Sequence, residues 1–258
     1  MKTHTRAALT TLLCLNLLPA FAQPRMGAAP DGSGMNPAMA KLFGDNTTFT
    51  ANLEDQINGS SAAGLRTIPG KIAFDSGKMR FDMNMGEAKG GEMDRAAAQM
   101  KSMGMDQIVT ISLPDKKTSY MIYPGLQAYV ETPMKNPEAG EPESDFKMQT
   151  TELGKETIDG HPCVKNKAVV TDEKGSTNEF TVWNATDMKN FPLKIEAHAG
   201  GMTITMLYKD VKFEKPDAKL FEPPTDYKKY DNQMNLMQQE IMKRMGGAMG
   251  GMHPPERP

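Results

Sequence analysis

Cysteine is scarce in this sequence. Of the two cysteines among 258 residues, Cys14 lies in an N-terminal segment interpreted below as a signal peptide, which leaves Cys163. A single cysteine cannot form an intramolecular disulfide, so the fold must be stabilised by packing. Paired cysteines at zinc spacing, an HExxH motif and a Gly-rich phosphate loop are all missing from the sequence. These absences exclude a disulfide-stapled domain and leave no motif for a zinc or nucleotide site.

Histidine is also rare, which bears on catalysis. Beyond the N-terminal segment the histidines are His161, His198 and His253. His161 and Cys163 are two residues apart, the spacing of neighbours on one face of a strand. However, Gly160 and Pro162 indicate a strand-entry turn, and a lone cysteine is most often a buried apolar residue. We therefore predict no catalytic residues, no cofactor and no enzymatic activity.

Net charge and long apolar runs are limited as well. The chain carries 30 Lys+Arg against 32 Asp+Glu, a net charge of -2, which removes the electrostatic footprint of a nucleic-acid-binding protein. One apolar run, Ala7 to Leu18, follows Lys2 and Arg6 and precedes a small-x-small site at Ala20-Phe21-Ala22. This pattern predicts a cleavable signal peptide over residues 1–22 and a periplasmic location. No transmembrane segment is expected, because spanning requires about 20 apolar residues.

Methionine is the residue in excess, with 23 copies against 16 leucines. Leucine is normally among the commonest residues of a globular protein. Part of the methionine falls on period-two positions, because Met79, Phe81, Met83 and Met85 alternate with polar residues after a turn at 75–77. This pattern predicts a β-hairpin in which methionine faces the core.

The rest of the chain predicts a mainly β (α+β) protein. Alternating patterns predict strands at 47–53, 107–113, 118–123, 127–132, 148–153, 164–171, 178–184, 193–199 and 204–208. Sequential hairpins of this kind form an antiparallel sheet. Apolar stripes predict one helix over 91–103 and a C-terminal helix with Tyr230, Met234, Met237, Ile241 and Met245, ending at Gly246-Gly247. We divide the chain into a signal peptide (1–22), a flexible leader (23–44), a β-rich domain (45–225), a Met-rich helix (226–246) and a disordered tail (247–258), with a polar loop at 133–145.

One block of the sequence resembles a known family. The block contains Gly160-x-x-Cys163, Trp183 before Phe191-Pro192-Leu193, a hairpin over 194–208, and Leu220-Phe221-x-Pro223-Pro224. In this order the features resemble the periplasmic LolA-like superfamily of lipoprotein carriers and related lipid-handling or anti-sigma-regulatory envelope proteins, in a branch described as a domain of unknown function. The resemblance covers about residues 45–230. It implies a curved antiparallel half-barrel, with helices covering the concave face and a hydrophobic cleft between them.

The methionine-bearing strands then suggest a ligand site. Methionine suits an apolar wall because its unbranched, polarizable side chain adapts to varied shapes. The candidate ligand-binding residues are Phe81, Met83, Met85, Met93, Met100, Met121, Met148 and Met206. The ligand expected from the resemblance is a lipid or the acyl chain of a lipidated protein. The alternative is that these side chains only fill a core, which periodicity does not distinguish.

Metal binding is a second hypothesis. Thioethers are soft ligands that favour Cu(I) or Ag(I). The candidate ligands are clustered as Met100, Met103 and Met105, and as Met249, Met252 and His253. Met100 also belongs to an apolar helical stripe, and close methionine pairs arise by chance at this methionine content. A third hypothesis is an interaction scaffold or envelope-stress regulator, in which the C-terminal helix binds an envelope protein instead of its own sheet.

Overall fold

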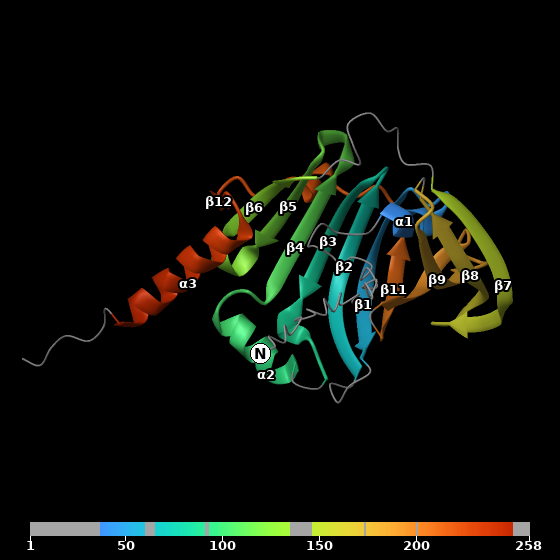
Figure 1. Ribbon diagram of the computed structural model, residues 1–258, viewed down its shortest axis with the longest axis horizontal. Helices are drawn as coiled ribbons and strands as arrows, with labels where there is room; N and C mark the ends of the chain where they lie inside the picture. Colours follow the sequence, from blue (N-terminus) through green and yellow to red (C-terminus); the bar gives the residue numbers. More distant parts are fainter. Residues whose placement is uncertain are drawn as a thin grey trace, which may run out of the picture.

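A computed structural model of the chain describes residues 37–59, 65–90, 93–134, 146–172, 174–199 and 201–249. It contains one 12-stranded sheet in the order β12-β6-β5-β4-β3-β2-β1-β11-β10-β9-β8-β7 (Figure 1). The strands are β1 (Thr48–Asn58), β2 (Leu65–Asp75), β3 (Lys78–Asn84), β4 (Gln107–Leu113), β5 (Thr118–Tyr123), β6 (Ala128–Pro133), β7 (Lys147–Ile158), β8 (His161–Thr171), β9 (Thr177–Ala185), β10 (Phe191–Ala199), β11 (Met202–Lys212) and β12 (Lys228–Tyr230). The pairings are antiparallel except β12 with β6, which is parallel. The predicted mainly β, antiparallel architecture with a C-terminal helix is confirmed.

The helices are short apart from α2 and α3. They are α1 (Pro37–Ala40), η1 (Lys41–Phe43), η2 (Met85–Glu87), α2 (Met93–Ser102), η3 (Pro114–Lys116), η4 (Pro124–Leu126), η5 (Ala218–Phe221) and α3 (Gln233–Met249). The predicted helix over 91–103 corresponds to α2, which packs against η2 just after β3. Figure 1 shows α1 lying within the curve of the sheet and α3 extending from the end that carries β12.

The sheet curves around a cluster of aromatic rings. Phe43 of η1 lies with its ring centroid 4.9 Å from Phe49, 6.1 Å from Phe74, 5.6 Å from Phe191 and 5.6 Å from Tyr208. These four rings belong to β1, β2, β10 and β11, which are consecutive in the sheet. Because neighbouring strands lie about 4.8 Å apart, one ring reaches all four strands only where the sheet bends around it. The face that carries these rings is therefore concave.

The opposite, convex face is crossed by the chain between β11 and β12. Phe221 of η5 packs with Ala73, Val109 and Ile111, and Leu220 borders the same cluster. Ala73 alternates with the concave-face residues Ile72 and Phe74, so it points to the convex side. Arg80 Nη1 donates a hydrogen bond of 3.1 Å to the carbonyl of Leu220, which ties this crossing segment to β3.

Two sequence-based boundaries are corrected by the structure. Met85 was expected on a strand but lies in η2, because β3 ends at Asn84. The C-terminal helix was expected to include Tyr230 and to end at Gly246-Gly247. Instead Tyr230 belongs to β12, and α3 begins at Gln233 and continues to Met249. Asn232 Oδ1 accepts a hydrogen bond of 2.8 Å from the Asn235 amide, and this cap fixes where the helix begins.

Candidate ligand-binding face

A band of half-buried apolar side chains crosses the concave face. Strand register places each of them on the same face as Leu53, which is buried. We call this band the concave strip, and its members are Ala197 (β10), Ile204 and Met206 (β11), Ile57 (β1), Phe81 and Met83 (β3), Ile108 (β4) and Met121 (β5). Fully buried clusters border the strip on both sides. The strip is thus an apolar surface that the described residues cover only in part.

One end of the strip meets a cluster built on α3. Leu236 of α3 is buried against Tyr123, Val130 and Tyr230, which lie on β5, β6 and β12. Met105, Met121 and Met237 are half-buried at the edge of this cluster. Docking of the C-terminal helix on its own sheet was the simpler of the two sequence interpretations, and it is what the structure contains. Helix α3 therefore forms one wall of the concave face.

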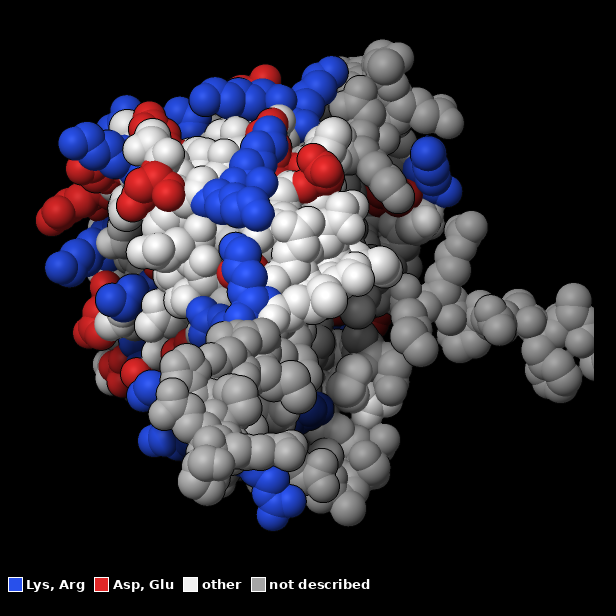
Figure 2. All heavy atoms as spheres, turned by 90° about the vertical axis from the view of Figure 1, so that its left-hand side faces the viewer, with Lys and Arg blue, Asp and Glu red and all other residues white. Residues whose placement is uncertain are grey.

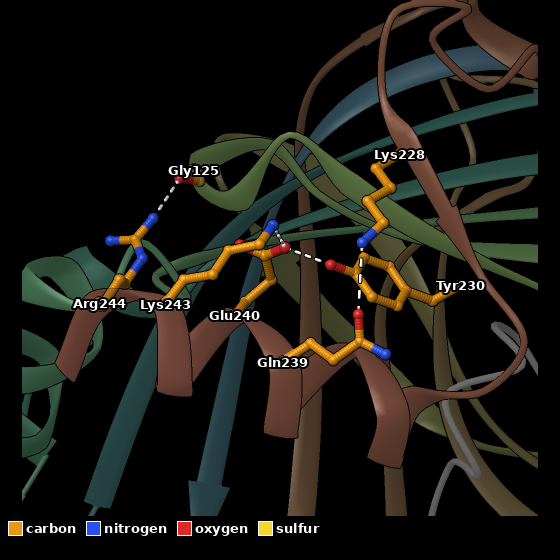
Figure 3. Close-up of polar contacts among 7 residues, drawn as sticks. All are labelled: Gly125, Lys228, Tyr230, Gln239, Glu240, Lys243 and Arg244. Atoms are coloured by element: carbon orange, nitrogen blue, oxygen red, sulfur yellow. Dashed lines mark hydrogen bonds and ion pairs between the residues drawn. The ribbon is translucent and has the colours of Figure 1, made fainter. Parts of the chain in front are cut away.

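Polar contacts fix α3 to the sheet. Glu240, which is 8% exposed, accepts hydrogen bonds from the Tyr230 hydroxyl and from Lys243 Nζ at 2.6 Å (Figure 3). Burial opposes ionisation of Glu240, but these two hydrogen bonds and the charges of Lys243 and Lys228 together lower its pKa below the ordinary value. A buried carboxylate with such partners holds the helix in one position.

The far end of α3 reaches a close contact between two loops. Arg244 Nη2 donates to the carbonyl of Gly125 at 2.9 Å. Gly125 lies so near Gly104 that a Cβ on either glycine would come within 2.7 Å of the other's carbonyl oxygen. Only glycine permits this approach. The close approach of the two glycines joins the turn after α2 to η4. Arg244 in turn joins α3 to η4 (Figure 3).

The outer surface at this end has an uncharged area with charged side chains around it. Figure 2 views the molecule from the side on which α3 lies in Figure 1, and it shows a line of basic side chains crossing an otherwise mostly uncharged area. Met234 and Met242 of α3 are 79% and 64% exposed. Among the helices of the described residues, none is both long and apolar enough to cross a membrane.

Two polar groups interrupt the apolar concave face. Asp55 of β1 lies opposite Ile68 and Met206, and Arg66 of β2 lies opposite Ile57. Asp55 Oδ1 and Arg66 Nε are buried, and neither has a hydrogen-bond partner in the part of the chain that the structure describes. Burial raises the pKa of Asp55 to about 7. Neither residue was singled out from the sequence, although an aspartate between Leu53 and Ile57 breaks the apolar alternation of its strand.

The convex face has a different character. It carries two adjoining hollows of about 520 and 300 Å³. Both are lined by Lys71, Arg80 and Asp82, and Arg80 Nε lies 2.7 Å from Asp82 Oδ1. These paired charges do not form the apolar wall that a hydrophobic ligand requires. The concave strip therefore remains the better candidate for such a site.

The predicted ligand-binding residues separate into groups. Phe81, Met83, Met121 and Met206 lie together in the concave strip. Met85 and Met100 are half-buried in η2 and α2, which follow the C-terminal end of β3. Met148 lies instead on the edge strand β7 and is 44% exposed. Met93 begins α2, but its side chain is outside the described set.

The predicted metal ligands are partly described. The amides of Met103 and Met105 donate to the Met100 carbonyl at 3.1 and 2.9 Å, which folds the three residues into one turn at the end of α2. Within the described part of the chain, no group of three or more His, Cys, Asp or Glu is placed to hold a metal ion. Met252 and His253 lie outside the described residues, as does the side chain of Met249.

His161 and Cys163 do not form a dyad. His161 Nδ1 lies 2.8 Å from Asp187 Oδ2, and the Cys163 thiol donates to the His161 carbonyl at 3.5 Å. Cys163 is 2% exposed, and burial raises the pKa of its thiol. A buried thiol with a raised pKa is a poor nucleophile. The sequence left the state of Cys163 open, and the structure places it in the core.

Residues 57–190, more than half of the chain, match the family model described as Domain of unknown function (DUF4412). The chain therefore belongs to the DUF4412 family. No curated protein sequence matches it.

Solved structures of the LolA superfamily and of mycobacterial lipoproteins are similar to this chain in architecture. A LolA superfamily protein from Nitrosomonas europaea is 8% identical, with 72% of this chain and 94% of that chain covered and a TM-score of 0.37. Lipoprotein LppX from Mycobacterium tuberculosis is 10% identical (68% and 93% covered, TM-score 0.37), and LprF from Mycobacterium bovis is 12% identical (74% and 95% covered, TM-score 0.38). The likeness stops at architecture, and no residue role transfers from it.

Proposed function

We propose that this protein binds a hydrophobic ligand, a lipid or the acyl chain of a lipidated protein, on the concave strip without chemical change. The observation that carries the proposal is the set of apolar side chains left half-buried on one face of β10, β11, β1, β3, β4 and β5, with the buried Ile68 of β2 between β1 and β3. Each buried methylene contributes about 0.8 kcal/mol, so ten methylenes of an acyl chain contribute roughly 8 kcal/mol before the entropy costs of binding.

The composition of the strip fits a flexible apolar ligand. Met83, Met121 and Met206 are three of its eight members, and methionine repacks around varied shapes more readily than a branched side chain does. Helix α3 and the turn after α2 flank the strip, and they limit how far a bound chain extends. The periplasm is the proposed location, with a cleavable signal peptide at 1–22 as the sequence predicts. The mass of protein purified from its native envelope tests the cleavage.

Displacement of the fluorescent probe N-phenyl-1-naphthylamine tests the proposal. Met83→Lys and Met206→Lys each place a charge on the strip, and both should weaken probe binding at least about tenfold, because an unpaired charge is costly on an apolar surface. Met148→Lys is the matched control, since it makes the same change on the exposed edge strand β7. Equal affinity of all three variants and the wild type would overturn the proposal. Lipid extraction from natively purified protein identifies the bound class.

A second candidate function is binding of Cu(I) or Ag(I) by thioethers. It is favoured by the turn that draws the backbones of Met100, Met103 and Met105 together. Titration with Cu(I) against a competing chelator should then show weaker binding in a variant with all three residues changed to Leu. Met148→Leu serves as the control. Unchanged affinity in the triple variant would remove this candidate.

A further inference from the structure

The two unpartnered groups on the concave face are unusual for buried polar atoms. Most buried polar groups in proteins have a hydrogen-bond partner, and an orphan costs free energy. Asp55 Oδ1 and Arg66 Nε have none among the described residues, whereas Arg80 and Asp82 on the convex face bond each other. The concave pair therefore lowers the stability of the free protein. A ligand that forms hydrogen bonds with both groups would offset this cost.

Their relative position follows from strand register. Asp55 pairs with Ile68, and Arg66 pairs with Ile57, so the two residues are diagonal neighbours on the concave face. Diagonal neighbours on adjacent antiparallel strands lie about 7–8 Å apart. Within the described part of the chain, no ion pair joins them. One small polar group can thus contact both side chains at once.

Across the neighbouring strands, the described residues offer Asp55 no substitute partner. Its neighbours across the strands are Ile68 and Met206, both apolar. Tyr208 is next to Met206 on the concave face, but its hydroxyl is directed to Met206 Sδ at 3.9 Å. Ile57, Ile204 and Met206 of the concave strip adjoin the same position. The polar pair and the apolar strip therefore form one continuous surface.

We propose that Asp55 and Arg66 anchor the head group of the ligand, and that this ligand is an amphiphile whose uncharged head carries hydroxyl groups, such as a monoacylglycerol. One head-group hydroxyl donates to Asp55 Oδ1, and a head-group oxygen accepts from the Arg66 Nε–H. The acyl chain lies along the concave strip. The inference rests on the proposed function and names its ligand class.

Hydroxyl chemistry fits this pair better than a charged head group does. Above the pKa of Asp55, which is about 7, an ionised aspartate and an arginine cancel in charge, so neither an anionic nor a cationic head gains net attraction; the competition is therefore measured at pH 8. A fatty-acid carboxylate next to Asp55 adds a second acid to an apolar place, where like charges repel. A quaternary ammonium head offers Asp55 no N–H or O–H donor. A hydroxyl supplies both the donor and the acceptor that the two orphan groups lack.

Competition for N-phenyl-1-naphthylamine by three ligands tests the inference. The ligands are 1-monooleoylglycerol, oleate and methyl oleate, which share one acyl chain and differ at the head. Wild type should bind 1-monooleoylglycerol about tenfold or more tighter than methyl oleate, because two hydrogen bonds to charged groups are gained. Asp55→Leu and Arg66→Met should each remove that preference and leave methyl oleate unchanged. Asp55→Asn, which keeps an acceptor oxygen at the same position, should restore most of it.

The matched control pair is Asp82→Leu and Arg80→Met, which removes the same two side-chain types from the convex face. These variants should keep the wild-type preference. An equal affinity of wild type for the three ligands, a preference for oleate, or a preference retained in Asp55→Leu would overturn the head-group inference while the strip still binds acyl chains. If none of the three ligands displaces the probe, both proposals fail. Urea unfolding followed by the fluorescence of Trp183, the single tryptophan, verifies that each variant is folded.

Discussion

The two faces of the central strands use the same residue types in opposite ways. On the convex side, Arg80 bonds Asp82, and Lys209 Nζ lies 2.9 Å from Glu54 Oε2. On the concave side, Asp55 Oδ1 of β1 and Arg66 Nε of β2 are buried and have no partner among the described residues. Alternation along β1, β2, β3 and β11 decides which of these side chains goes to which face. The convex charges satisfy one another, whereas the concave charges are left available for a ligand.

The contrast extends to the apolar residues. The convex cluster around Phe221 is covered by the segment that crosses from β11 to β12. The concave face has a buried centre around Phe43 and a strip that stays half-buried between two clusters. Apolar surface that other residues cover contributes only to stability, whereas apolar surface that stays partly exposed can also bind a ligand. Substitutions on the two faces should therefore differ in the size of their effect and in whether they affect stability or binding.

The largest effect is expected at the centre of the concave face. Phe43→Ala removes the ring that contacts four strands and should lower the free energy of unfolding by about 3–5 kcal/mol. Leu220→Ala on the convex crossing segment, where the side chain is only half-buried, should cost clearly less. Urea unfolding followed by Trp183 fluorescence measures both. Equal losses would contradict the assignment of the main core to the concave side.

The next effect is a pH dependence due to Asp55. Its folded pKa of about 7 lies above the ordinary value of 3.8, so the folded state holds a proton that the unfolded state releases between these pH values. The free energy of unfolding should therefore fall as pH rises from about 4 to 7, by at most about 4 kcal/mol for a shift of about 3 pKa units. Asp55→Leu should remove this slope and stabilise the protein above pH 7.

The matched variant for this pH dependence is Asp82→Leu. Because Asp82 is paired with Arg80 on the convex face, this change should leave the slope between pH 4 and 7 as in the wild type. Unfolding curves at several pH values measure the slope for each variant. A wild-type slope retained in Asp55→Leu would show that another group causes it.

A smaller, local effect is expected at α3. Glu240→Gln loses the ion pair with Lys243 and should cost about 1–3 kcal/mol, seen as faster amide hydrogen exchange in residues 233–244. Since the pKa of Glu240 is lowered, its contribution is present above the ordinary carboxyl pKa and is lost as pH falls through the folded value. Glu131→Gln, which breaks the exposed convex pair with Lys229, should have little effect. Equal exchange in both variants would contradict the role of Glu240 in fixing the helix.

Much of the candidate site was predictable from alternation. Phe81 and Met83 were placed on the correct face because period-two patterns are local and survive any sheet order. Met148 follows the same pattern, but it lies on an edge strand, where no neighbouring strand covers it. Asp55 carried a signal in its position between Leu53 and Ile57. That signal acquires meaning only when Met206 and Ile68 are known to be its neighbours.

The boundaries of the strands and helices were also predictable where they depend on local sequence and not where they depend on distant contacts. The strand at 107–113 was predicted at its observed limits because its apolar residues and flanking turn are contiguous in sequence. The three-residue β12 was missed, because its stability comes from parallel pairing with β6 and not from its own residues. Tyr230 was assigned to the helix on spacing alone, yet pairing with Val130 and the hydrogen bond to Glu240 hold it in the strand.

The sequence by itself determined the mainly β class, the hairpins, the two faces of each strand and the placement of methionine on apolar faces, since all of these follow from local periodicity and turn residues. Tertiary structure alone decided the curvature around Phe43, the docking of α3 and the juxtaposition of Asp55 with Arg66. Those features depend on contacts between residues far apart in the chain. Periodicity says which face a residue occupies, but it does not say which neighbours share that face or how much of it stays open.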